Sequence, residues 1–283
     1  HFTIEQRSFY KFKMEADSTI RHGGGTDEYP EYLLQENQLP TEDNIALFRA
    51  ALQGSVSECE RLLRKGAKPN FFFRPEDQKN ALHVAAEHGF VDVCKLLLSH
   101  GAEANSLSTA DQASALTLAA HNDDPTLIKV LLDAGAHINH GNGYGNTALH
   151  EACRIGNGAT IQCLLQHGAD INARNHKGST PLHIFCYGDA SDSHGRHIGK
   201  DRHTDTLCRV LLDNGAQVDA RDARGATPLL VCCTSGKLEL IEVLLAFGAD
   251  ILVVDNKNQG AMDIAQFYGQ EGVCKFLASK GFK

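Results

Sequence analysis

Short apolar segments recur along the chain in pairs, with a turn rich in glycine, asparagine or aspartate inside each pair. In the unit over 143–172 these segments are 148–153 and 161–165, and Gly156, Asn157 and Gly158 separate them. Segments of this length around helix breakers predict a helix, a turn and a second helix. A single pair this short cannot bury its apolar stripe, so the pattern predicts that it packs against neighbouring copies of itself.

The same unit recurs at a nearly constant spacing. The leucine of its first helix recurs as Leu47, Leu82, Leu116, Leu149, Leu182 and Leu229, with Met262 in the last copy. A glycine follows the second helix, where a residue that tolerates positive φ is favoured, at Gly66, Gly101, Gly135, Gly168, Gly215, Gly248 and Gly281. Successive glycines lie 33 to 35 residues apart, except for one step of 47 that contains an insertion. Self-similarity at this period predicts a solenoid of helix pairs.

Several stretches of the repeat carry a family resemblance. STPLH at 179–183, ATPL at 226–229, NTALH at 146–150 and the repeated Leu-Leu-x-x-Gly-Ala resemble ankyrin repeats. The resemblance implies an all-α fold, namely a solenoid of stacked helix-turn-helix units with β-hairpin fingers and a concave binding face. It also implies that the motif histidine, here His83, His150 and His183, ties the turn of one repeat to its neighbour. It implies nothing about the partner.

The repeat register predicts how the chain is divided. We expect an N-terminal extension over 1–40 and an ankyrin repeat domain over 41–283. The seven repeats are predicted near 41–77, 78–111, 112–144, 145–177, 178–224, 225–257 and 258–283. The insertion lies at 188–205, between the two helices of the fifth repeat, and its polar, glycine-bearing composition predicts a loop that folding does not require. The last repeat ends almost at Lys283, so no further domain is expected to follow.

Composition and charge narrow the partner class. A formal net charge of −8 and a pI near 6.0 disfavour nucleic acid and anionic membranes as partners. The chain has no apolar run long enough to insert into a bilayer. Its nine cysteines follow the repeat, at small apolar positions of the helices, so we expect them to be buried. An odd number of cysteines without a C-x2-C pair is typical of a reducing, intracellular compartment, the cytoplasm or the nucleus.

One segment carries residues that could hold a metal. The insertion contains His194, His197 and His203 among four aspartates, and imidazole and carboxylate groups are ordinary zinc ligands. Nothing in the sequence fixes their geometry, so the favoured interpretation is a solvated loop without metal. The chain also lacks a nucleophile–base pairing, an HExxH motif and a phosphate-binding loop. No enzymatic activity and no cofactor are therefore expected.

The repeat register predicts where a partner protein binds. The candidates lie at finger and first-helix positions of repeats 4 to 7, on the concave face: Tyr144, Arg154, Ile155, His176, Lys177, Tyr187, Arg224, Asn256, Lys257, Phe267 and Tyr268. Aromatic and arginine side chains are enriched at interface centres because they bury much area with few rotors. A partner segment with apolar anchors and some acidic residues would suit this surface.

One finger residue is also a candidate for modification. Asp170-Ile171-Asn172 resembles the sequence that asparaginyl hydroxylases prefer in ankyrin proteins. The other interpretation of Asn172 is an unmodified turn asparagine that forms hydrogen bonds.

The combined hypothesis is a non-catalytic scaffold or adaptor that works within a larger assembly. The alternatives are a regulatory or targeting part of a larger enzyme or ubiquitin-ligase complex, and a metal-binding protein that uses the histidine-rich insertion.

Overall fold

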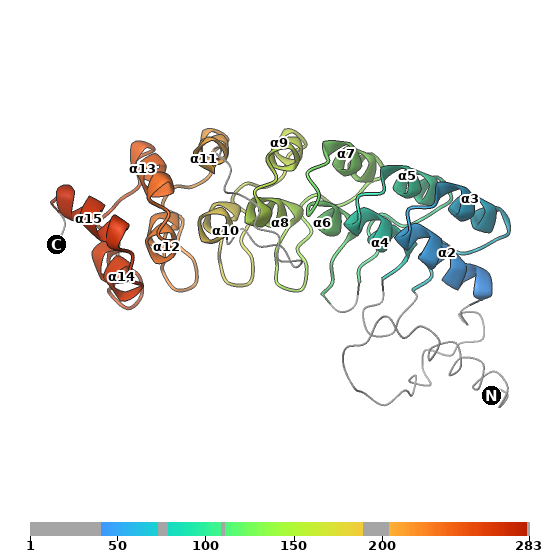
Figure 1. Cartoon of the computed structure of the whole chain (residues 1–283), viewed down its shortest axis with the longest axis horizontal. Coiled ribbons are helices and arrows are strands. Elements are labelled where there is room, and N and C mark those ends of the chain that lie inside the picture. Colours follow the sequence, from blue (N-terminus) through green and yellow to red (C-terminus); the bar gives the residue numbers. More distant parts are fainter. Residues whose placement is uncertain (1–40, 73–78, 109–110, 189–203, 282–283) are drawn as a thin grey trace, which may run out of the picture. The chain divides into compact units, whose positions relative to one another are not determined.

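The computed structural model describes residues 41–72, 79–108, 111–188 and 204–281. Its helices are short and are joined by turns (Figure 1). They are α2 (Glu42–Leu52), α3 (Val56–Arg64), α4 (Ala81–Glu87), α5 (Val91–Ser99), α6 (Ala115–Ala119), α7 (Pro125–Asp133), α8 (Ala148–Ile155), α9 (Gly158–Gln166), α10 (Pro181–Tyr187), α11 (Thr204–Asp213), α12 (Pro228–Ser235), α13 (Leu238–Ala246), α14 (Ala261–Phe267) and α15 (Glu271–Ser279).

The helices pair off in chain order and form two rows. The even-numbered helices, here called the inner helices, contact one another from α2 to α14. The odd-numbered, outer helices form a second row beside them, and loops project from one edge of the array (Figure 1). The chain is thus an all-α solenoid of helix-turn-helix units, as predicted.

The core runs continuously through the array rather than forming one central cluster. The inner-helix leucines from Leu47 to Leu229 are at most 1% exposed, and equivalent outer-helix leucines such as Leu97 and Leu164 are fully buried. Eight of the nine cysteines are buried, as predicted. Cys274 and Met262 are half-buried instead, because they belong to the last helix pair, against which no later pair packs within the described residues.

Local sequence determines where the helices begin and end. Thr147 caps α8 by accepting a hydrogen bond from His150 N, and Pro125 occupies the first turn of α7 after the N-cap Asp124. The glycine after each outer helix has a φ between +83° and +96°, so the left-handed residue predicted at this position is present in every repeat.

The connections between repeats, here called the fingers, are tight turns rather than extended hairpins. Two backbone bonds close each of the later loops, for example Asn175 N to Ser179 O at 3.0 Å and Gly178 N to Asn175 O at 2.8 Å. Within the described residues the only β-bridge joins Leu107 and Ser114, so the β-hairpins that the resemblance implies are reduced to their turns. The Asn175 side chain occupies the loop by accepting from the N–H groups of Lys177 and Ser179.

The motif histidines join neighbouring repeats. His150 and His183 each lie with Nε2 3.1 Å from a carbonyl oxygen of the next repeat, and Nε2 of His83 lies 2.9 Å from Ser106 O in the finger that leads to the next repeat. The Nδ1 atom of each accepts the N–H of the helix N-cap, so Nε2 carries the donated proton. Burial lowers the pKa of all three below that of free histidine, which keeps them neutral. The structural role implied by the resemblance is confirmed.

A row of asparagines provides a second link between repeats. Asn70, Asn105 and Asn172 each donate from Nδ2 to the carbonyl of the helix-ending glycine of the next repeat, at 2.9 to 3.0 Å. Each also accepts from a backbone N–H two residues after that glycine. Leu252 occupies this position in the sixth repeat, where an apolar side chain cannot form either bond. The last repeat therefore lacks this link.

Candidate protein-binding site

The surface formed by the inner helices and the finger tips, here called the inner face, carries side chains that differ between repeats. Five residues after the motif leucine or its counterpart Met262, near or just beyond the end of the inner helix, the side chain changes from repeat to repeat. From the second to the last repeat this position holds Glu87, His121, Arg154, Tyr187, Thr234 and Phe267. Such variation on a fixed scaffold is where specificity can reside.

Most of the predicted binding residues are exposed. Tyr144, Tyr187, Phe267 and Tyr268 are 68%, 58%, 75% and 53% exposed. The other exposed candidates are the finger residues His176, Lys177, Arg224, Asn256 and Lys257. Phe267 and Tyr268 contact each other edge to face, with ring centroids 5.1 Å apart. Large exposed aromatics of this kind are expected at a contact surface.

The prediction for Ile155 is wrong, because its side chain is buried. Ile155 is the last residue of α8, and Gly156 follows it in a left-handed conformation that turns the chain toward α9. The side chain is therefore enclosed at the helix junction rather than exposed on the inner face. Arg154, one residue earlier, is half-buried and lies on the inner face.

The finger tips of repeats 4 to 7 are joined into a row by backbone hydrogen bonds. His176 N donates to Tyr144 O at 3.0 Å, and Ala223 N donates to Lys177 O at 2.9 Å. Asn256 N continues the row by donating to Arg224 O at 2.9 Å. Because the backbone of each tip is fixed to its neighbour, the side chains of the tips are presented in a regular order.

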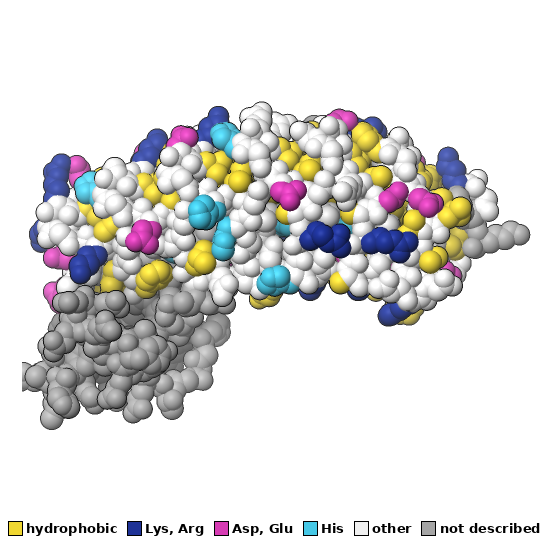
Figure 2. All heavy atoms as spheres, turned by 180° about the vertical axis from the view of Figure 1, so that it is seen from behind, with side chains coloured by type: hydrophobic (Ala, Val, Ile, Leu, Met, Phe, Trp, Pro, Cys, Tyr) yellow, Lys and Arg dark blue, Asp and Glu magenta, His cyan; other side chains and the backbone are white. Residues whose placement is uncertain are grey.

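The charges of the tips differ in how far they are neutralised. Arg224 pairs with the buried Asp222 carboxylate, with Nη2 3.2 Å from Oδ2. Lys177 and Lys257 are exposed and form no ion pair with any residue that the structure describes. On the face drawn in Figure 2, acidic and basic side chains are interspersed and histidines lie near the middle. The row of tips thus keeps cations that are available to a partner.

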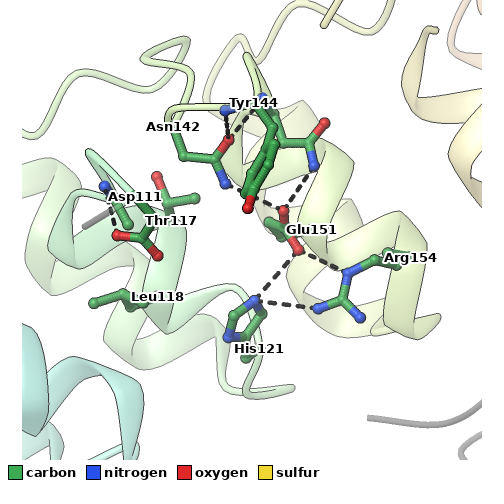
Figure 3. A pocket seen from close by; sticks show the side chains of 10 residues that line it. Asp111, Thr117, Leu118, His121, Asn142, Tyr144, Glu151 and Arg154 are labelled. Carbon is green, nitrogen blue, oxygen red and sulfur yellow. Dashed lines mark hydrogen bonds and ion pairs between the residues drawn. The ribbon is translucent and has the colours of Figure 1, made fainter. Parts of the chain in front are cut away.

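A pocket of about 300 Å³ opens on the inner face between the third and fourth repeats (Figure 3). Glu151 of α8 lies at its base with only 8% of its side chain exposed. Its Oε2 accepts from Arg154 Nε at 2.8 Å and lies 3.3 Å from His121 Nε2. Its Oε1 accepts from Asn146 at 3.0 Å and from Asn142 at 3.4 Å. The carboxylate therefore fixes side chains from two repeats.

The electrostatics of Glu151 follow from these contacts. Burial alone would raise the pKa of the carboxyl group, since it penalises the charged form. The hydrogen bonds from His121, Arg154 and Asn146, together with the charge of Arg154, outweigh burial and lower the pKa to about 2. Glu151 is therefore ionised at any physiological pH.

The sequence did not reveal Glu151 as part of the site. Glu151 lies in the first helix where other repeats have apolar residues such as Leu118 and Val231, so a carboxylate in this row was a usable signal. Asp111, Asn142 and Asn146, which also line the pocket, belong to the fingers and were likewise not among the predicted residues.

The described residues bear on two other possibilities, a metal site and a membrane-spanning helix. Within the described ranges, no three His, Cys, Asp or Glu side chains come together to hold a metal ion. His194, His197 and His203 lie outside those ranges. No helix in the described part of the chain is long and apolar enough to cross a bilayer.

Comparison with known proteins gives one consistent result. A family model described as ankyrin repeats (3 copies) matches residues 24–108, 116–193 and 199–283. The chain is similar to the ankyrin repeat domain of human ASB11, with 24% identity and a TM-score of 0.68 over 81% of this chain and 96% of that one. It is also similar to the ankyrin repeat domain of Bcl-3, a member of the IkappaB protein family, with 26% identity and a TM-score of 0.65 over 82% and 97%. A search of curated proteins gave no match.

Proposed function

This chain belongs to the ankyrin repeat family, and from that premise we propose that it is a non-catalytic scaffold or adaptor that binds a partner protein on its inner face. Ankyrin repeats are in general protein-interaction modules. The observation that carries the proposal is the set of exposed aromatic side chains on one surface, including Tyr144, Tyr187 and Phe267. Exposing these side chains is unfavourable unless a partner covers them.

The partner segment is expected to run along the row of finger tips, from the fourth to the seventh repeat. The spacing of the tips is fixed by their backbone bonds, so side chains of an extended segment can meet successive repeats in register. Tyr187 and Phe267 would accept apolar anchors, while Lys177 and Lys257, which are exposed and form no ion pair within the described ranges, would meet acidic residues. This binding role would place the chain within a larger assembly.

Site-specific photo-crosslinking tests the proposal. The full chain, with a benzophenone amino acid at Tyr144 or at Tyr187, is exposed to a lysate of the source cells and irradiated, and adducts are identified by mass spectrometry. The matched controls carry the same group at Lys129 or at Glu239, which are exposed on the outer helices α7 and α13. We expect one protein to be captured from both inner-face positions and from neither control. Capture of the same protein from the outer helices alone would refute the assignment of the face.

A further inference from the structure

The pocket between the third and fourth repeats contains two carboxylates that differ in how completely they are satisfied. Glu151 already accepts from Asn142, Asn146, His121 and Arg154, so both of its oxygens are occupied. It holds the wall of the pocket in place and offers little to a ligand. A ligand would have to be bound by the groups that remain.

Asp111 has bonding capacity left. Its Oδ1 accepts from the Ser108 hydroxyl and from Ala113 N, and no donor in the described part of the chain reaches Oδ2. The residue is half-buried, and its carboxylate projects into the pocket in Figure 3. The two Oδ1 bonds fix the orientation of the carboxylate, so Oδ2 is a preorganised acceptor.

The other walls of the pocket include an aromatic ring and two apolar side chains. In Figure 3 the Tyr144 ring lies beside Asn142 and Glu151, across the view from Asp111, and its hydroxyl has no hydrogen-bond partner within the described residues. Leu118 and Ala113, both largely buried, add an apolar part of the lining, and the polar side chains of Thr117, His121, Asn142 and Asn146 complete it. An aromatic face beside a carboxylate and an aliphatic surface can accept a side chain that is apolar along its stem and cationic at its end.

The charges in the pocket favour a cation. Arg154 is paired with Glu151 at 2.8 Å, so each neutralises the other. Asp111 then supplies a negative charge that no described cation neutralises. The volume of about 300 Å³ lies at the lower end of the range for ligand sites, which suits one long side chain better than a cofactor.

We propose that this pocket binds an arginine side chain of the partner protein, with the guanidinium group on Asp111 Oδ2 and against the Tyr144 ring, and the methylene stem on Leu118. A planar guanidinium can donate to the carboxylate and stack on the ring at once, which a lysine ammonium cannot do. This inference rests on the proposed function, and it predicts the direction in which the bound segment lies along the repeats. Its basic anchor lies at the third and fourth repeats, and its acidic residues extend toward Lys257.

A small probe tests the pocket without the partner. The full chain, with ¹³C-labelled Leu and Ala methyl groups, is titrated with N-acetyl-arginine amide and separately with N-acetyl-citrulline amide, which has the same shape without the charge. We expect the Leu118 and Ala113 methyl signals to shift with the arginine probe alone. Asp111→Asn, which keeps the oxygen that Ser108 and Ala113 use, should weaken this binding about fivefold. Tyr144→Leu should weaken it about threefold.

Asp133→Asn is the matched control, because Asp133 is an exposed aspartate at the end of the outer helix α7. It should leave the titration unchanged. Equal binding of arginine and citrulline, or an Asp111→Asn variant that binds as well as the wild type, would overturn the proposal. Its failure is distinct from failure of the proposed function, because crosslinking from Tyr187 does not depend on this pocket.

Discussion

Replacing Glu151 by glutamine should destabilise the protein in a way that depends on pH. Asn142, Asn146 and Arg154 all donate to the carboxylate, and His121 Nε2 lies 3.3 Å from Oε2. The Asn142 amide cannot turn round, because its oxygen already accepts from the N–H groups of Tyr144 and Asn146. A glutamine NH₂ at position 151 would therefore face another donor in either orientation, and the ion pair with Arg154 would be lost.

The size of the effect follows from the lowered pKa. The shift from 4.5 to about 2 corresponds to about 3 kcal/mol of stability. Because the folded-state pKa is the lower one, this contribution is complete above the unfolded-state pKa near 4.5 and is lost as the pH falls toward 2. By pH 3 about 2 kcal/mol of it is gone. Glu151→Gln should therefore cost about 3 kcal/mol at pH 7 and about 1 kcal/mol at pH 3.

Urea unfolding followed by circular dichroism at the two pH values measures this difference. Other acidic groups of the protein change charge between these pH values as well, but their effects cancel when variant and wild type are compared at one pH. Asp133→Asn, on an exposed aspartate, should show almost no penalty at either pH. A Glu151→Gln penalty that is the same at pH 3 and pH 7 would refute a lowered pKa as its source.

Three further predictions concern packing, capping and thiol access. Leu149 is 1% exposed between helices of adjacent repeats. Leu149→Ala should therefore lower the free energy of unfolding in urea by about 2 to 5 kcal/mol, and a decrease of less than about 0.5 kcal/mol would contradict its place in the core. The buried Nδ2 of Asn80 has no hydrogen-bond partner among the described residues, and the equivalent N-cap of α8, Thr147, has a hydroxyl instead of an amide. Asn80→Thr should therefore stabilise the protein by about 1 kcal/mol, and destabilisation would show that the amide is satisfied in solution. A disulfide reagent should modify the half-buried Cys274 quickly and the buried cysteines only on unfolding. Burial blocks access to these thiols and also disfavours the reactive thiolate, as in Cys94, whose pKa is raised to about 12. Rapid reaction of several thiols in the native protein would contradict this prediction.

The hydroxylation of Asn172 stays a prediction. The side chain bridges two repeats, from Nδ2 to Gly215 O and from Gln217 N to Oδ1. An added hydroxyl on its Cβ would appear in the intact mass of the protein from its natural source as one extra oxygen atom. An unmodified mass would favour the purely structural role.

The fold could be predicted from the sequence because the same pattern of residues recurs in every repeat. A single short apolar segment such as 148–153 is ambiguous, but the recurrence of Leu149 and Gly168 in register leaves few alternatives to stacked helix pairs. The positive φ of those glycines and the bonds of His150 follow from residue type and position alone. Local chemistry determined these features, so they could be predicted.

The site was harder to predict, because it depends on contacts between repeats. Ile155 has the register of an inner-face residue, yet the turn at Gly156 buries it. Glu151 stands out in a mostly apolar row, but its contact with His121 of the preceding repeat is visible only in the structure. Asp111 and Tyr144 belong to successive fingers, and only the structure shows that they line the same pocket. Interactions between residues 30 to 40 positions apart carry no local signature in one sequence.

The most direct test of the account is the affinity for the partner that crosslinking from Tyr187 identifies. Binding of that partner should be measured for the full chain, for Tyr187→Ala with Phe267→Ala, and for the outer-helix control Lys129→Ala with Glu239→Ala. Both double variants change exposed side chains, so their thermal unfolding should match that of the wild type. We predict about tenfold weaker binding for the inner-face variant and no change for the control. Affinity within about twofold for the inner-face variant, with binding lost in the control, would contradict the proposal that the inner face binds the partner.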